Sequence, residues 1–143
     1  MVFLKHPLAP EIDRERLRAE VYSARSVPVR VNGYLTMAPL CVLCAAPLVE
    51  GTGFHMHEAL VTRGDLPVSM QDAIWHPYNV VLLCPTCHWR HGHSLHVLEG
   101  DEDDSPERRF VKSQVDRYGR ERIESWLQSL PLRNPKSLSA WGL

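Results

Sequence analysis

Residues 79–96 read NVVLLCPTCHWRHGHSLH, and the rest of the chain is organised around this stretch. An apolar run leads into Cys84 and Cys87, and an earlier C-x-x-C pair is formed by Cys41 and Cys44. Two residues between paired cysteines allow a single turn to direct both thiolates at one tetrahedral ion. The two pairs therefore predict one structural Zn²⁺ held by four thiolates, in preference to disulfides or free buried cysteines.

The segment between the two pairs is too long for a plain zinc ribbon and must form a structural unit of its own. It contains FHMHEAL at residues 54–60, and seven of the eight histidines of the chain lie between positions 55 and 96. The pattern predicts a strand over 54–61, a long loop over 62–78 and a second strand over 80–83. A helix is expected to begin at Pro85, since proline is tolerated in a first helical turn.

Further elements are predicted on both sides of this unit. Residues 10–23 have the acidic start and apolar spacing of a helix, and residues 27–37 alternate like a hairpin. Asn32 and Gly33 form its favoured two-residue turn, and Pro28 places the first strand at a sheet edge. The remaining segments are predicted to be an acidic linker, two helices and a tail, at residues 100–104, 105–118, 120–130 and 132–143.

Composition limits the class of protein. A chain of 143 residues fits one domain with extensions, and cysteine pairs among histidines favour a reducing, cytosolic setting. Neither a signal peptide nor a run of about 18 apolar residues is found, so no membrane span is predicted. The formal net charge of −1 is low for a DNA-binding domain, which would therefore need a local basic patch.

Taken together, His57, Asn79 and His88 between two cysteine pairs resemble the HNH endonuclease family, the ββα-metal nucleases. The resemblance covers roughly residues 40–96, and its most specific part is N-x-x-L-L-C-x-x-C-H. It implies an α+β fold with a small zinc-stabilised ββα-metal core and flanking N- and C-terminal helices. The expected division is an N-terminal extension, the core, and an acidic linker with C-terminal helices, at residues 1–37, 38–98 and 99–143.

The resemblance also implies an activity, which is hydrolysis of DNA phosphodiester bonds. HNH enzymes use a histidine base and one divalent metal, such as Mg²⁺, Mn²⁺ or Ni²⁺, and leave 5′-phosphate and 3′-hydroxyl ends. The short format resembles stand-alone phage or prophage proteins, which implies DNA as partner, phage packaging or replication proteins by analogy, and a bacterial cytoplasm. The alternatives are a catalytically degenerate zinc-stabilised nucleic-acid-binding module and a structural zinc protein.

The family pattern assigns the general base to His57, but the preceding position holds Met56, where the family has a metal ligand. A thioether is a poor ligand for Mg²⁺ or Mn²⁺. Two registers stay open. Either His57 is the base and a neighbour, Glu58 or His55, supplies the ligand, or His57 is the ligand and Glu58 is the base.

The other site residues follow from the same resemblance. Asn79 is expected to tie the long loop to the hairpin, and His88 to bind the catalytic metal. One helical turn later, His91 is expected to join that metal or to contact phosphate. Arg63 matches a basic residue of the family pattern, and Arg90 is a basic residue near the site; both are expected to contact nucleic acid.

Overall fold

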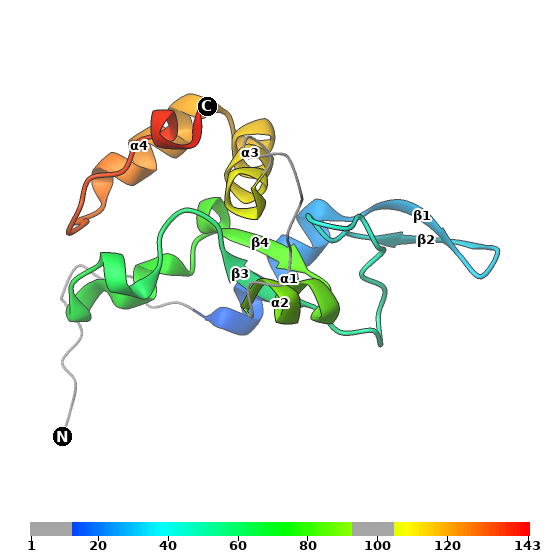
Figure 1. Cartoon of the computed structure of the whole chain (residues 1–143). Helices are drawn as coiled ribbons and strands as arrows, with labels where there is room; N and C mark the ends of the chain where they lie inside the picture. The colour runs from blue at the N-terminus through cyan, green and yellow to red at the C-terminus, as the bar shows by residue number, and fades with distance from the viewer. Residues whose placement is uncertain (1–12, 93–104) are drawn as a thin grey trace, which may run out of the picture.

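A computed structural model describes residues 13–92 and 105–143 of the chain. These residues form a mixed helix and sheet structure, so the predicted α+β class is confirmed (Figure 1). The helices and strands are α1 (Arg14–Arg25), β1 (Val27–Val31), β2 (Tyr34–Ala38), β3 (His55–Glu58), β4 (Val80–Leu83), α2 (Pro85–Gly92), α3 (Pro106–Tyr118) and α4 (Arg120–Ser129).

Some predicted features fall outside the described residues. They are the first turn of the helix predicted at 10–23, the acidic linker at 100–104, and two histidines, His93 and His96. Among the helices that the structure describes, none combines the length and the apolar character needed to cross a membrane.

Local sequence explains where the helices begin and end. The side chain of Asp13 caps α1 by accepting a hydrogen bond from the backbone N–H of Arg16 at 3.1 Å. Ser105 caps α3 in the same way, and Pro106 occupies its first turn. Gly119 ends α3 with a positive φ of 92°, and α4 starts directly behind it. The predicted helix boundaries are therefore confirmed to within a few residues.

The structure contains two antiparallel hairpins. The β1–β2 hairpin turns at Asn32 and Gly33, whose φ values of 51° and 81° are both positive, as the predicted turn requires. The β3–β4 hairpin pairs His57 with Val81, and all four β4 residues are buried. The first strand, at residues 55–58, is shorter than the predicted 54–61. Helix α2 follows β4 directly, so a strand pair and a helix meet at the second cysteine pair.

The long connection between β3 and β4 is more ordered than the loop predicted for it. It contains three 3-10 helices, η1 (Arg63–Asp65), η2 (Val68–Ile74) and η3 (Pro77–Asn79). The η2 helix covers the helical turn that the sequence predicts near residues 70–74. Buried Leu66 and Ile74 anchor this connection in the core.

One hydrophobic core joins the three segments that the sequence divides at residues 37 and 98. Helix α1, strand β4 and the two C-terminal helices all contribute to it. Its members include Leu17, Val21, Val80, Val81, Leu82, Leu83, Phe110, Val111, Ile123, Leu127 and Leu138. The flanking helices are thus packed parts of the body that carries the central hairpin.

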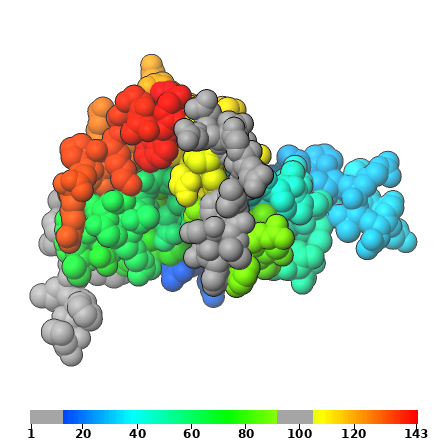
Figure 2. All heavy atoms as spheres, viewed as in Figure 1, coloured from blue at the N-terminus to red at the C-terminus, as the bar shows by residue number. Residues whose placement is uncertain are grey.

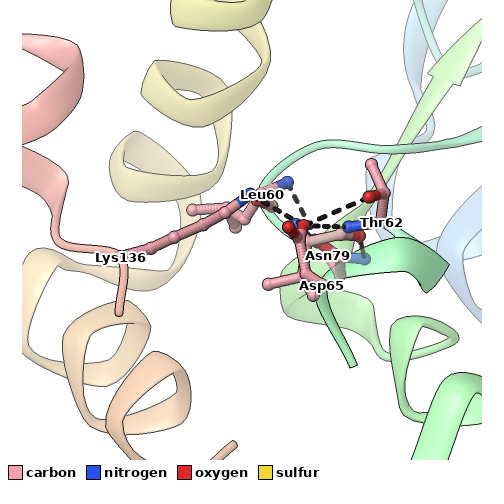
Figure 3. Close-up of polar contacts among 6 residues, drawn as sticks. Leu60, Thr62, Asp65, Asn79 and Lys136 are labelled. Carbon is pink, nitrogen blue, oxygen red and sulfur yellow. Dashed lines mark hydrogen bonds and ion pairs between the residues drawn. The ribbon is translucent and has the colours of Figure 1, made fainter. Parts of the chain in front are cut away.

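The predicted tail at 132–143 is instead folded back onto this body. It contains a short 3-10 helix, η5 (Leu138–Trp141), whose first residue is fully buried. Lys136 Nζ donates to the carbonyl of Leu60 at 2.9 Å and forms an ion pair with Asp65 at 2.8 Å (Figure 3). The backbone N–H of Arg133 donates to the carbonyl of Asp65 at 2.9 Å. These contacts attach the C-terminal segment to the connection that follows β3.

Candidate metal centre and histidine cluster

The four cysteines converge on one point. Their Sγ atoms all lie within 4.8 Å of one another, and Cys44 Sγ is 3.8 Å from Cys84 Sγ. A tetrahedral Zn²⁺ with bonds of about 2.3 Å requires Sγ–Sγ separations of about 3.8 Å. The donor set and its spacing therefore fit a metal ion such as zinc, as the two C-x-x-C pairs predict.

Each pair sits in a turn that the backbone holds. In the first, the N–H of Ala45 donates to the carbonyl of Cys41 at 2.8 Å, and the N–H of Cys41 donates to the carbonyl of Ala46 at 2.9 Å. The N–H of Val42 donates to the carbonyl of Leu82 at 3.2 Å, which joins this turn to β4. The second pair opens α2. Both pairs are therefore attached at the C-terminal end of β4.

Thiol chemistry makes this cluster depend on a cation. Burial and the neighbouring thiols of Cys84 and Cys44 raise the pKa of Cys87 well above its ordinary value. Burial likewise raises the pKa of Cys44. Metal binding must displace the protons of these thiols, so the affinity of the site for metal falls as the pH falls.

A second cluster consists of four histidines from two elements. Along β3, His55 and His57 project on the same face, because side chains two positions apart in a strand share a face. On α2, His88 and His91 are separated by one helical turn. The ring of His55 stacks on His88 with centroids 4.2 Å apart, and the ring of His57 meets His91 edge to face at 4.7 Å.

The structure thus brings together His57, His88 and His91, three of the predicted site residues. The ring centroids of His57 and His88 are 5.8 Å apart. It also adds His55, which the sequence offers only as a possible replacement for the missing ligand at Met56. The spacing H-x-H on a strand is the signal that identifies His55 as a member of the cluster.

Strand alternation separates Glu58 from these rings. Met56 and Glu58 occupy the alternate positions of β3, so they belong to the opposite face from His57. Met56 packs against the hydrophobic core. Of the two neighbours that could supply a ligand beside His57, His55 is the one on the shared face.

The two clusters differ in how their ligand atoms are directed. Within residues 13–92 and 105–143, the four cysteines form the one group of three or more potential ligands whose donor atoms converge closely enough for a single ion. The histidine rings stack or meet edge to face. A divalent ion among the histidines therefore requires their rings to turn.

His57 lies in an apolar and partly enclosed environment. Its ring centroid is 5.0 Å from that of Phe110 on α3, and Glu107 of the same helix approaches His91 Nδ1 at 4.0 Å. Burial, together with the positive charge that His91 would carry, lowers the pKa of His57 to about 4, although Glu58 opposes this shift. At neutral pH the imidazole is uncharged and retains a lone pair that can accept a proton. The motif gave no sign of the contributions of Phe110 and Glu107, which lie outside the region of family resemblance.

Asn79 is fully buried, and its side-chain amide makes four hydrogen bonds to the backbone. Its Oδ1 accepts from the N–H groups of Leu60 at 2.9 Å and Val61 at 2.8 Å. Its Nδ2 donates to the carbonyls of Val61 at 2.8 Å and Ile74 at 2.9 Å. Figure 3 shows this amide beside the segment that Lys136 and Asp65 hold. Asn79 therefore joins the start of β4, the segment after β3 and the η2 helix at one point.

The two arginines predicted to contact nucleic acid are exposed. Arg63 lies on η1 with its guanidinium carbon 5.9 Å from the ring centroid of Trp75. Arg90 lies on α2, two positions after His88, and residues two apart on a helix do not share a face. Their predicted role remains a prediction.

Comparisons of the chain with protein-family models, with curated proteins and with solved structures found no match. The function is consequently inferred from the chemistry of the chain's own residues.

Proposed function

We propose that this protein is a metal-dependent HNH endonuclease that hydrolyses DNA phosphodiester bonds and carries a structural Zn²⁺ at its four cysteines. The observation that carries this proposal is the position of His57. Its neutral imidazole lies beside His88 and His91, on a hairpin whose far end Asn79 fixes. This is the combination of base, metal-binding side chain and supporting amide that the sequence resemblance calls for.

Phosphodiester hydrolysis needs an activated water, stabilisation of charge on the phosphate, and assistance to the leaving oxygen. In the proposal His57 accepts the proton of the attacking water. A divalent ion, when bound, supplies the charge stabilisation, and His88 with His55 or His91 would hold it. Because imidazole suits Ni²⁺ better than Mg²⁺, this donor set favours Ni²⁺ over Mg²⁺ as the activating metal.

A basic groove between α3 and Val42 of the first cysteine turn supports DNA as the substrate. The formal net charge of the chain is −1, so binding to a polyanion needs a local concentration of positive charge. This groove has a volume of about 700 Å³ and contains four cationic side chains and a single acid. Its charged lining residues are Arg108, Arg109, Lys112, Arg117 and Asp116.

The second candidate function is a zinc-stabilised nucleic-acid-binding module that does not cut. It is favoured by the stacked histidine rings and by Met56 at the usual ligand position. Such a module would use the basic groove and the cysteine cluster in the same way. Only the histidine cluster distinguishes the two candidates.

The deciding experiment is cleavage of supercoiled plasmid by purified, zinc-loaded protein with Ni²⁺, Mn²⁺ or Mg²⁺ added. We expect nicks that DNA ligase reseals without end repair, because the expected ends are 5′-phosphate and 3′-hydroxyl. His57→Ala should abolish nicking, while His76→Asn, a histidine change outside the cluster, should leave it intact. Binding without cutting under every metal would support the module, and 3′-phosphate ends would rule out HNH chemistry.

A further inference from the structure

The β1–β2 hairpin extends away from the body of the protein and exposes apolar side chains. Figures 1 and 2 show it as an arm that projects beyond α1 and the first cysteine turn. Tyr34 is 78% exposed, Leu35 is 68% exposed and Met37 is 56% exposed. An isolated two-stranded hairpin is at best marginally stable in water. The arm is therefore suited to being covered by a partner.

Its two edges differ in their ability to pair. A two-residue turn makes Val31 and Tyr34 a hydrogen-bonded pair, and bonded and non-bonded pairs then alternate along the strands. Pro28 and Arg30 consequently direct their backbone groups outward from β1, and Leu35 and Met37 direct theirs outward from β2. Proline has no N–H and charge discourages pairing, so the outer edge of β1 is protected.

The outer edge of β2 has no such protection. Within the described part of the chain, the sheet has two strands, and β2 pairs with β1 alone. Residues 31–49 contain no charged side chain, although 23% of the whole chain is charged. An exposed apolar edge that keeps its N–H and carbonyl groups is a template for another strand.

We propose that β2 pairs with β2 of a second copy of this chain, antiparallel across a twofold axis at Thr36. The two arms then form one four-stranded sheet. In this register Leu35 lies opposite Met37 of the other copy, and the outward backbone groups of these residues form four hydrogen bonds. Tyr34 lies opposite Ala38, whose side chain is already buried within each copy, so the side chains that meet across the axis are those of Leu35, Thr36 and Met37.

The sequence selects this register from its neighbours. It is the one symmetric register that overlaps all five residues of β2. A shift towards the turn would place Gly33 opposite Met37 and lose the strand end. The opposite shift would place Pro39, which has no N–H to donate, opposite Leu35. Since β2 carries no charge, no like charges meet across the axis.

Proline substitutions at matched positions test the edge directly. Leu35→Pro removes an outward N–H from β2, and Arg30→Pro removes the equivalent outward N–H from β1. We expect the zinc-loaded parent and Arg30→Pro to sediment as dimers at micromolar concentration. Leu35→Pro should raise the dimer dissociation constant by roughly tenfold or more. Zinc content and circular dichroism report whether each variant is folded.

A second pair of variants avoids altering the backbone. Thr36→Lys places two like charges opposite each other at the twofold axis, whereas Thr36→Val keeps a β-branched, uncharged residue there. The lysine variant should be monomeric and the valine variant dimeric. A monomeric parent, a dimer that persists in both Leu35→Pro and Thr36→Lys, or equal dissociation of Leu35→Pro and Arg30→Pro would overturn the proposal. None of these measurements depends on nuclease activity.

Discussion

His55, two positions before His57, is the residue at which this site differs from the HNH pattern. Adjacent side chains of an extended strand project on opposite faces, so a side chain at position 56 of β3 projects away from His57 and His88. His55 projects on the same face as His57, and its ring already stacks on that of His88. The side chain of Met56 instead packs against the hydrophobic core. In the proposed nuclease, His55 would take the place of the metal ligand that the HNH resemblance predicts at position 56.

This inference predicts different defects for neighbouring substitutions. His57→Ala should lower the cleavage rate by about 10²–10⁴-fold, because it removes the base, and leave divalent-metal affinity within a few-fold. His55→Ala and His88→Ala should weaken metal binding, and excess metal should partly restore their cutting. Glu58→Ala should have little effect on either quantity. Calorimetric metal titration beside single-turnover cleavage separates these cases. If Glu58→Ala loses cleavage while His57→Ala loses metal, the alternative register is correct.

Ala45, directly after the first cysteine pair, offers a residue-scale test of stability. Its φ is 62°, in the left-handed region that costs a non-glycine residue roughly 1–2 kcal/mol. Glycine removes that strain but adds freedom to the unfolded chain. Ala45→Gly should therefore raise the free energy of unfolding by about 0.5–1 kcal/mol in urea titrations. Ala46→Gly, next to it, should lower stability. A loss of stability in Ala45→Gly would show that the turn is not strained.

At the scale of elements, sequence prediction succeeds where the signal is local. Local geometry is specified by the C-x-x-C spacing, by the Asn32-Gly33 turn and by the apolar run of β4. The structure contains the predicted hairpins and helix starts. The contact of Phe110 with His57 depends on how α3 folds back over distant residues. The anchoring of η1 by Lys136 is equally non-local. No period or motif encodes such contacts, so a segment interpreted as a tail proves to be part of the body.

The η3 helix gives an element-scale prediction for pH. His76 caps it, because His76 Nδ1 accepts the N–H of Tyr78 at 3.1 Å, and its ring stacks on Trp126. Burial lowers the pKa of His76 from its usual value of 6.5. The unfolded chain therefore binds this proton more readily than the folded chain, so the stabilisation is complete above about pH 6.5 and is lost as the pH falls through the folded-state pKa.

Asparagine retains an acceptor for the cap but does not titrate. At pH 7 the free energy of unfolding of His76→Asn should be lower than that of the parent, because the variant lacks the ring that stacks on Trp126. Between pH 7 and about pH 5, however, it should decrease less in the variant than in the parent. Urea unfolding at several pH values measures this difference. The pH dependence of stability that remains in the variant would come from other histidines, of which His55 and His57 also have lowered pKa values. Parallel pH profiles for parent and variant would exclude His76 as a contributor.

For the whole molecule, the placement of charge matters more than its sum. A chain of net charge −1 nevertheless concentrates four cations in one groove on α3. We expect a combined Lys112→Ala and Arg117→Ala variant to bind duplex DNA more weakly and with a salt dependence reduced by about two units of slope. Arg120→Ala with Arg122→Ala, the same charge change on α4, is the control. Equal losses in both variants, measured by fluorescence anisotropy at several salt concentrations, would show that net charge alone controls binding.

Because the described residues share a single core, a metal ion held by the four cysteines would affect the stability of the whole fold. The cysteine turn that precedes β3 in the sequence and the one that follows β4 meet at one cluster. Strand β4 packs in the same core as α1, α3 and α4. Binding energy at such a site is folding energy. Cys84→Ser, or removal of Zn²⁺ by a chelator, should therefore abolish amide-exchange protection in α4 together with that in β4, although α4 contains no ligand. Ala46→Ser, a serine substitution in the turn of the first cysteine pair, should keep one zinc per chain and full protection in both elements. Protection that survives in α3 and α4 after metal removal would mean that the C-terminal helices fold as an independent unit.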